Sequence, residues 1–181
     1  KLLRFFFIGT LSAFGALFLE LALEVISSPT PIVHSALPTS VTPLMLSAII
    51  IEEGIKYIIL KKILQSLSSK FIFSSIAFAA GFGLTEIAFI FFSTPVFSYY
   101  FLTGILILHF LTIGWAAMIL QLYYYSNSRL VPLFTLFIMI IIHLGYNGLI
   151  VYSFSTGTVY VYLIISSLIL LLTSHLSRTA S

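Results

Sequence analysis

Long apolar runs separated by short polar connections make up most of this chain. Several of the runs reach about 18 residues, the length at which an α-helix can cross the hydrocarbon core of a bilayer. A transmembrane barrel would instead show short segments that alternate between apolar and polar residues. The pattern therefore predicts an all-α, polytopic transmembrane helical bundle of about six spans, at residues 2–26, 44–64, 71–92, 100–122, 130–153 and 159–175.

The composition supports a membrane location and excludes several classes of function. Hydrophobic residues make up 60% of the 181 residues and charged residues only 7%, a balance that no soluble domain shows. The chain contains no cysteine, so disulfides and thiol chemistry are excluded. Its net charge of +3 comes from basic residues at the ends of the runs, which form no patch for nucleic acid. We find no internal repeat, so residues 1–181 are predicted to form a single transmembrane domain.

The lysines and arginines outside the runs predict the orientation in the membrane. All of them lie on one side of the predicted bundle: Lys1, Arg4, Lys61, Lys62, Lys70, Arg129 and Arg178. The three connections on the other side contain neither residue type. By the positive-inside rule both termini are cytoplasmic, in a multi-pass protein of the cell membrane if the source is prokaryotic. The first run is too long for a signal-peptide core and is expected to be a retained span.

Charged residues interrupt the isoleucine-rich second run. Glu52, Glu53 and Lys56 lie within five residues of one another. An ionised side chain near the middle of a bilayer costs roughly 3 kcal/mol or more, so such groups usually face a bundle interior or a water-filled cavity. Glu52 and Lys56 are one helical turn apart and are expected to pair.

The rare polar residues of four runs fall at a similar depth. A span offers about 30 Å in which such residues could be scattered. At 1.5 Å per residue from the non-cytoplasmic end, they cluster roughly 9–15 Å deep: Glu52, Glu86, His109, His143 and Asn147. These side chains are therefore predicted to converge on one intramembrane polar site.

Several polar and small residues also have a purely structural interpretation. A single buried histidine often only donates to a backbone carbonyl, and this applies to His109 and His143 taken separately. Glu20 and Glu24 lie near the outer boundary, where water can reach them, and a structural role is expected for both. Small residues let membrane helices approach closely, and this is the expected role of four glycines: Gly81, Gly83, Gly104 and Gly114.

Histidines and carboxylates in a protected cavity suit hydrolysis by either of two routes. They can hold a metal such as zinc with an open position for water, with His109, His143 and Glu86 as candidate ligands. Alternatively, a glutamate acts directly as general base on a water that a histidine orients. Asn147 is one turn from His143 and can donate its amide hydrogens to an oxyanion, an interaction typically worth about 3 kcal/mol. The sequence leaves both routes open.

Four motifs in order resemble the PrsW-type intramembrane proteases. These belong to the wider group of CAAX prenyl-proteases and bacteriocin-processing and self-immunity proteins. The resemblance covers about 100 residues, within a predicted catalytic core at about 44–153. Its motifs are Glu52-Glu53-x-x-Lys56, Gly81-Phe82-Gly83-x-x-Glu86, His109-x4-Gly114 and His143-x3-Asn147.

This resemblance implies an endopeptidase that acts on membrane-embedded or membrane-anchored substrates. It assigns water activation to Glu52 and makes Glu53 essential. His109 and His143 would bind the water or a metal, with zinc as the candidate cofactor, and Asn147 would stabilise the oxyanion. Glu86 is included in the catalytic set, as a residue expected to orient a neighbour.

Two departures from the family pattern refine these expectations. The PrsW pattern commonly has Asn after the third-span Glu, where this chain has Ile87. The prenyl-protease branch commonly has Arg at the last position of the Glu-Glu motif, where Lys56 stands. The second departure favours the PrsW branch, whose substrates include anti-sigma-factor-like single-span proteins.

Two other functions remain open from the sequence. A small ion-coupled transporter could use Glu52, Glu53, Glu86 and the histidines as a proton or cation relay. Such carriers usually show repeats or broken helices in corresponding halves, which this chain lacks. A non-catalytic relative that binds a membrane partner is the other possibility, although the complete Glu/His/Asn set argues against it.

Overall fold

The described parts of the chain are almost entirely α-helical, which confirms the predicted all-α class. The computed structural model describes residues 2–27, 42–66, 71–93, 99–123, 130–152 and 155–179. Each of these ranges holds one helix: α1 (Leu2–Ser27), α2 (Pro43–Ser66), α3 (Phe71–Ser93), α4 (Tyr99–Leu122), α5 (Leu130–Val151) and α6 (Thr156–Thr179).

Most predicted boundaries agree with these helices to within a few residues. The largest differences are at α6, which begins three residues before the predicted start and continues four beyond the predicted end. Most of the proline-rich connection between α1 and α2, residues 28–41, lies outside the described residues.

Local sequence signals explain where two of the helices begin. The Thr42 side-chain oxygen accepts a hydrogen bond of 3.1 Å from the Met45 backbone N–H. Pro43 is the first helical residue, where its missing N–H costs nothing. At the start of α6, the Ser155 hydroxyl accepts a bond of 3.3 Å from the Thr158 N–H. Both helices therefore begin at an N-cap residue that supplies an acceptor to otherwise unpaired N–H groups.

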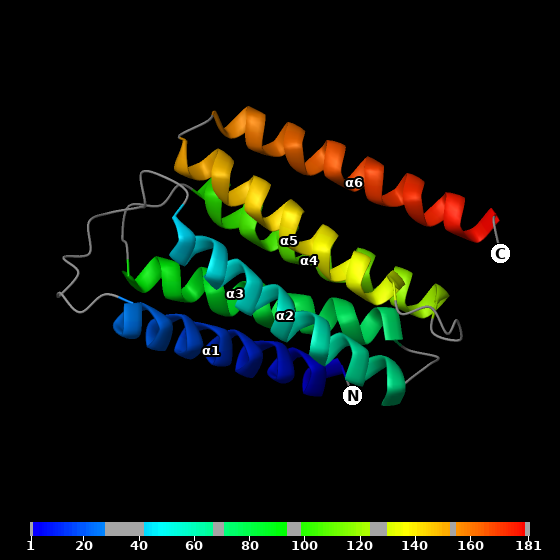
Figure 1. The fold of residues 1–181 in the computed structure, drawn as a ribbon, viewed down its shortest axis with the longest axis horizontal. Helices are drawn as coiled ribbons and strands as arrows, with labels where there is room; N and C mark the ends of the chain where they lie inside the picture. The colour runs from blue at the N-terminus through cyan, green and yellow to red at the C-terminus, as the bar shows by residue number, and fades with distance from the viewer. Residues whose placement is uncertain are drawn as a thin grey trace.

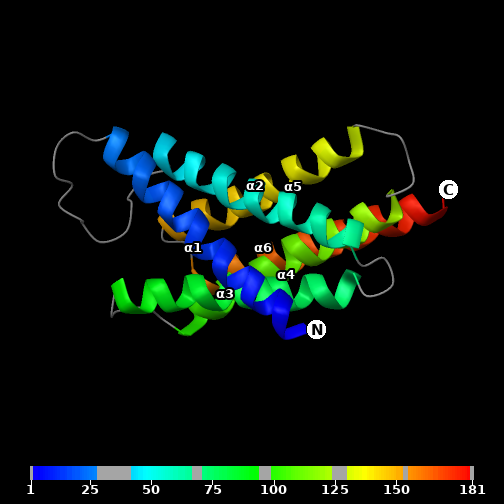
Figure 2. The ribbon, with the colours of Figure 1, turned by 90° about the horizontal axis from the view of Figure 1, so that it is seen from below.

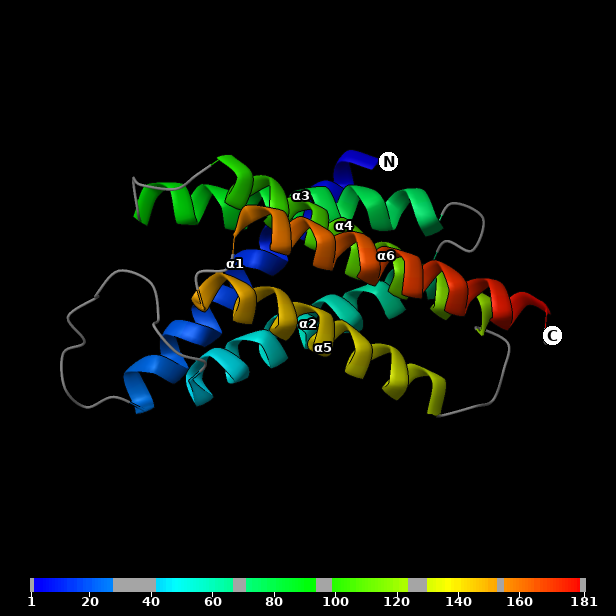
Figure 3. The ribbon, with the colours of Figure 1, turned by 90° about the horizontal axis from the view of Figure 1, so that it is seen from above.

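Successive helices run in alternating directions, so that both termini lie toward the same end of the bundle (Figure 1). Helices α3, α4 and α6 lie on one side, whereas α2 and α5 cross each other on the opposite side (Figures 2 and 3). Helix α1 crosses from the α3 side at its N-terminus to the α2 side at its C-terminus. Helix α4 contacts α2, α3, α5 and α6, and it carries the largest set of buried residues.

Apolar side chains lie on the outside of the bundle as well as in its core. Among the described residues, α1, α3, α4 and α5 are long and apolar enough to cross a membrane. Large apolar side chains are exposed on every helix, for example Phe18, Phe73 and Phe137. The charged residues of α2, by contrast, include the fully buried Glu53 and Lys56. Apolar residues outside and ion pairs inside form the arrangement expected of a helical membrane protein.

Helices α1 and α3 touch backbone to backbone through two glycines. A Cβ atom added at Gly9 would lie 2.2 Å from the Phe78 carbonyl oxygen. One added at Gly81 would lie 2.0 Å from the Phe6 carbonyl oxygen. Neither position can accept a side chain unless one helix moves away from the other. Gly81 therefore has the close-packing role predicted for it, at the contact between α1 and α3.

Replacing Gly9 by alanine should therefore destabilise the bundle, by about 1–3 kcal/mol for overpacking. Gly15→Ala is the matched control on the same helix, because a Cβ there meets nothing within 4 Å. The free energy of unfolding of both variants, measured by denaturant titration in one detergent, checks this prediction. An equal effect of the two substitutions would contradict the proposed close contact.

The other predicted packing glycines differ among themselves. A Cβ at Gly83 would lie 3.0 Å from the His109 ring, and one at Gly104 would lie 2.6 Å from the Tyr146 hydroxyl. These two glycines make room for side chains at the centre of the bundle. Gly114 does not, because a Cβ at that position meets nothing within 4 Å.

Candidate active site

Lys56 holds together both carboxylates of the Glu-Glu pair. Its Nζ donates to Glu53 Oε1 at 2.8 Å and to Glu52 Oε2 at 3.0 Å. The Lys56 and Glu53 side chains are fully buried, whereas Glu52 keeps 14% of its side chain exposed. Lys56 therefore does not extend to the membrane surface. It is the counterion of two carboxylates, of which one remains accessible.

The second contact of Glu53 joins α2 to α5. His143 Nδ1 donates to Glu53 Oε1 at 2.6 Å and lies 3.8 Å from Glu52 Oε2. A neutral His143 that donates from Nδ1 has its acceptor lone pair on Nε2. Glu53 therefore fixes both the position and the tautomer of His143.

A second carboxylate–histidine pair joins α3 to α4. His109 Nε2 donates to Glu86 Oε2, and the His109 side chain is fully buried while Glu86 is 24% exposed. Gly83, one turn before Glu86 on α3, leaves the space that the His109 ring fills. The sequence motif from Gly81 to Glu86 thus combines a helix contact, a space for the imidazole and its hydrogen-bond partner.

Aromatic contacts connect the two pairs. The Lys56 Nζ lies 4.4 Å from the centre of the Phe82 ring. The same ring lies 5.2 Å from the His109 ring, between centroids. The His109 and His143 rings meet edge to face at 6.0 Å. Four of the five residues predicted to share one intramembrane layer, Glu52, Glu86, His109 and His143, therefore lie close together around the centre of the bundle.

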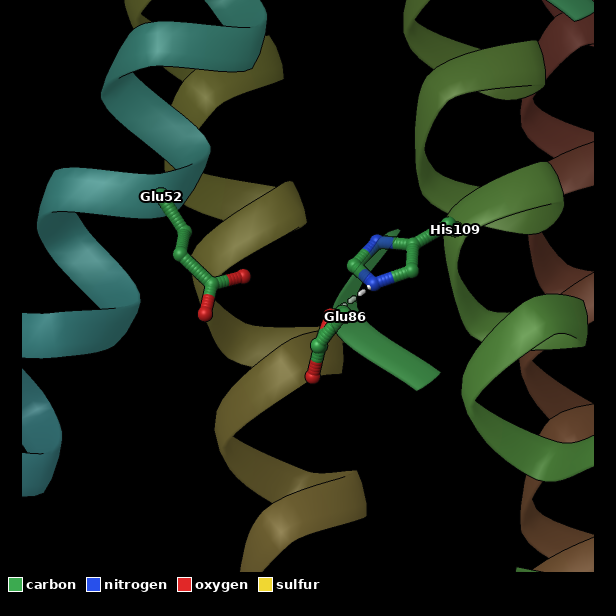
Figure 4. Close-up of side chains that lie close together, drawn as sticks. All are labelled: Glu52, Glu86 and His109. Atoms are coloured by element: carbon green, nitrogen blue, oxygen red, sulfur yellow. Dashed lines mark hydrogen bonds and ion pairs between the residues drawn. The ribbon is translucent and has the colours of Figure 1, made fainter. Parts of the chain in front are cut away.

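Glu52 and Glu86 face a common cavity of about 240 Å³ between α1, α2 and α3. Figure 4 shows the Glu52 side chain directed across a gap toward Glu86 and His109, each carried by a different helix. The α1 wall contributes the small residues Ala13 and Ala16. The accessible carboxylates of the site thus border a space that is large enough for several water molecules.

Asn147 lies beside a second, largely apolar cavity of about 190 Å³. Glu86 and Ile90 line both cavities, so the two spaces meet at this part of α3. Tyr146 also lines the second cavity and donates from its hydroxyl to the Phe101 carbonyl at 3.1 Å. Asn147 therefore lines a different cavity from Glu52, and the two cavities adjoin at Glu86.

The possible metal ligands form two groups among the described residues. Glu52, Glu86 and His109 form one, and Glu52, Glu53 and His143 form the other, with ligand atoms within 4.8 Å of one another in each. The three residues predicted as metal ligands, His109, His143 and Glu86, do not form one such group. The first group fits zinc better, because Lys56 pairs with only one of its carboxylates, Glu52, but with both carboxylates of the second group.

Glu20 is the site residue that the sequence interpretation missed. It lines the cavity together with Glu52 and Glu86, whereas the sequence interpretation gave it a structural role near the outer boundary. It lies seven residues before the end of α1, about 10 Å along the helix. That distance falls in the same polar layer as the other residues, so the depth pattern contained the signal. Glu24 lies only about 5 Å from this end and does not line the cavity.

Comparison with known proteins gives no relative for this chain. No family model matches it. No curated protein matches it, and neither does any solved structure.

Proposed function

We propose that this protein is an intramembrane endopeptidase of the PrsW type, which hydrolyses peptide bonds of membrane-embedded or membrane-anchored substrates. In this proposal all six helices span the bilayer, with both termini cytoplasmic. The site then lies in the non-cytoplasmic half, and water reaches it from that side. A single-span protein resembling an anti-sigma factor is the proposed kind of substrate.

The observation that carries this proposal is the position of Glu52. Its carboxylate is ion-paired with Lys56, yet it faces a cavity that Glu86 also lines. Glu86 in turn pairs with the buried His109. An anchored, accessible carboxylate beside an oriented imidazole suits general base catalysis on a bound water. A purely structural ion pair would not need a cavity of about 240 Å³ beside it.

The proposed reaction begins when Glu52 takes a proton from the bound water. The water oxygen attacks the substrate carbonyl carbon, and the electron pair of the C=O bond moves to oxygen. The C–N bond then breaks, and the proton on Glu52 passes to the leaving nitrogen. Glu53 and Glu86 act as positioning residues for His143 and His109. Asn147 would stabilise the oxyanion if the substrate carbonyl extends toward the second cavity.

The substrate must unwind locally before this reaction can occur. In a helix the carbonyl oxygens accept backbone hydrogen bonds and are shielded from attack. The cavity beside α1 presents the carboxylates of Glu20, Glu52 and Glu86, which can accept hydrogen bonds from the N–H groups of an unwound segment.

Zinc fits the group formed by Glu52, Glu86 and His109. When bound there, it would lower the pKa of a water ligand and polarise the substrate carbonyl. Removing metal with a chelator and adding zinc back distinguishes the two routes. Loss of activity and recovery with zinc would assign the ion a role, and full retention would assign water activation to Glu52 alone.

Hydrolysis in water enriched in ¹⁸O tests the proposed function directly. Purified protein in proteoliposomes is mixed with a panel of single-span peptides, and the products are weighed by mass spectrometry. We expect a cut within or beside the membrane segment, with one ¹⁸O in the new carboxyl group. No cleavage of any peptide by protein that remains folded would contradict the proposal.

An ion-coupled carrier is the second candidate, and one observation favours it. Glu86 lines both cavities, so a proton on this carboxylate would have access to two separate spaces. The same proteoliposomes, loaded with a pH-sensitive dye, separate the two candidates. Proton flux that disappears in Glu86→Gln, without peptide cleavage by the wild type, would identify the carrier.

A further inference from the structure

The cavity beside Glu52 has more hydrogen-bond acceptors than donors. Glu20, Glu52 and Glu86 line it, whereas no lysine, arginine or histidine of the described chain does. Lys56 pairs with Glu52 from the buried side, and His109 pairs with Glu86. Glu20 Oε1 is buried and has no partner among the described residues. The carboxylate of Glu20 therefore lacks the neighbour that each of the other two has.

A second buried atom without a partner among the described residues belongs to His109, which pairs with Glu86 but does not line the cavity. His109 is fully buried, and its Nδ1 has no hydrogen-bond partner within the described part of the chain. Because Nε2 donates to Glu86, Nδ1 is the acceptor nitrogen of the neutral ring. Figure 4 shows this ring extending from α4 toward Glu86 and Glu52. A buried acceptor without a donor can be satisfied by a bound water or by a ligand that brings a donor with it.

The distances between the possible metal ligands indicate what kind of ligand could pair with Glu20. The metal-compatible group at this cavity contains Glu52, Glu86 and His109 but not Glu20, whose oxygens do not join it. One small ion bound by that group therefore does not satisfy Glu20. A flexible side chain that carries several N–H donors and no acceptor can reach it, and lysine and arginine are the two residues of this kind.

We propose that Glu20 selects substrates that carry a lysine or arginine close to the cleaved bond. The inference rests on the proposed peptidase function and names the substrate class of that site. The basic side chain lies along the α1 wall, where Ala13 and Ala16 leave space, and donates to Glu20. The adjacent peptide bond then lies between Glu52 and Glu86. Glu20 is thus a specificity residue and takes no part in bond cleavage.

A matched set of peptides and variants tests this inference. Single-span peptides differ only in one residue, lysine or methionine, placed in turn at each position flanking the cleaved bond. We expect wild-type protein to cleave the lysine peptide at least 10-fold faster at one position. Glu20→Gln should lose this preference, so that its rate with the lysine peptide becomes equal to its own rate with the methionine peptide. Glu20→Asp, which keeps the charge, should keep the preference.

Glu24→Gln is the control, because it removes a carboxylate one turn away that does not line the cavity. It should retain the full preference. A charge reversal, Glu20→Lys, should favour peptides with glutamate at the same position. A lysine preference that is absent in the wild type, or that is unchanged in Glu20→Gln, would overturn the inference.

A binding measurement separates this inference from the proposed function. Photo-crosslinking of the same peptides to the Glu52→Gln variant reports binding without cleavage. If no peptide is cleaved, the proposed function fails, but a lysine preference in crosslinking that depends on Glu20 would still support the inference. Equal crosslinking of lysine and methionine peptides would overturn it, and would indicate that Glu20 is protonated and structural.

Discussion

Replacing Glu52 by glutamine should reduce peptide cleavage by about 10²–10⁴-fold, the usual contribution of a general base. Glutamine has nearly the same shape and can still occupy the wall of the cavity. It cannot take a proton from water, so the attacking hydroxide is not formed. Because Lys56 keeps its bond to Glu53, the bundle should remain folded. Initial cleavage rates at saturating peptide measure the effect.

Glu24→Gln is the matched control for this experiment, since it makes the same chemical change on α1 outside the cavity. It should leave the cleavage rate within about two-fold of wild type. Thermal unfolding of both variants shows whether either has lost its structure. Cleavage by Glu52→Gln at the wild-type rate would eliminate Glu52 as the base and with it the proposed mechanism.

Replacing Lys56 by methionine should cost about 3–5 kcal/mol of stability, the typical effect of removing one partner from a buried ion pair. The ammonium is fully buried and is the nearest cation to both Glu52 and Glu53. Methionine keeps much of the side-chain volume but leaves two carboxylates without a counterion. Denaturant titration in detergent measures the loss. Cleavage should fall as well, because Glu52 loses the contact that positions it.

Lys61→Met is the control, because Lys61 lies five residues further along α2 and is exposed. It should change the free energy of unfolding by less than about 0.5 kcal/mol. The double variant Lys56→Met/Glu53→Gln should recover part of the lost stability, since one of the unpaired charges is then absent. Equal effects of Lys56→Met and Lys61→Met would show that the buried ion pairs contribute little.

The sequence predicts the helices well because membrane spans have the strongest signal in a single sequence. Apolar length located all six helices of the structure. The positions of Glu52, Glu86, His109 and His143 along their helices predicted that these residues share a layer. Depth is a property of each helix alone, so it can be counted without knowledge of the fold.

The pairing within the layer could not be predicted, because it depends on which helices are neighbours. The structure pairs Glu53 with His143 and Glu86 with His109. Depth alone is equally compatible with the opposite pairing. The depth of Glu20 already placed it in this layer, but the sequence alone could not show which residues its carboxylate faces. Only the crossing of α1 past α3 toward α2 brings its carboxylate to the cavity.

The glycine contact between α1 and α3 also controls a residue far from it. Gly9 holds α1 against α3, and Glu20 lies eleven residues further along α1. The distance along the helix from this contact to Glu20 is about 17 Å. If α1 tilted by about 5° about its contact with α3, Glu20 would move by about 1.5 Å. That displacement is roughly half the length of a hydrogen bond. The position of the Glu20 carboxylate therefore depends on the backbone contact that Gly9 allows between α1 and α3.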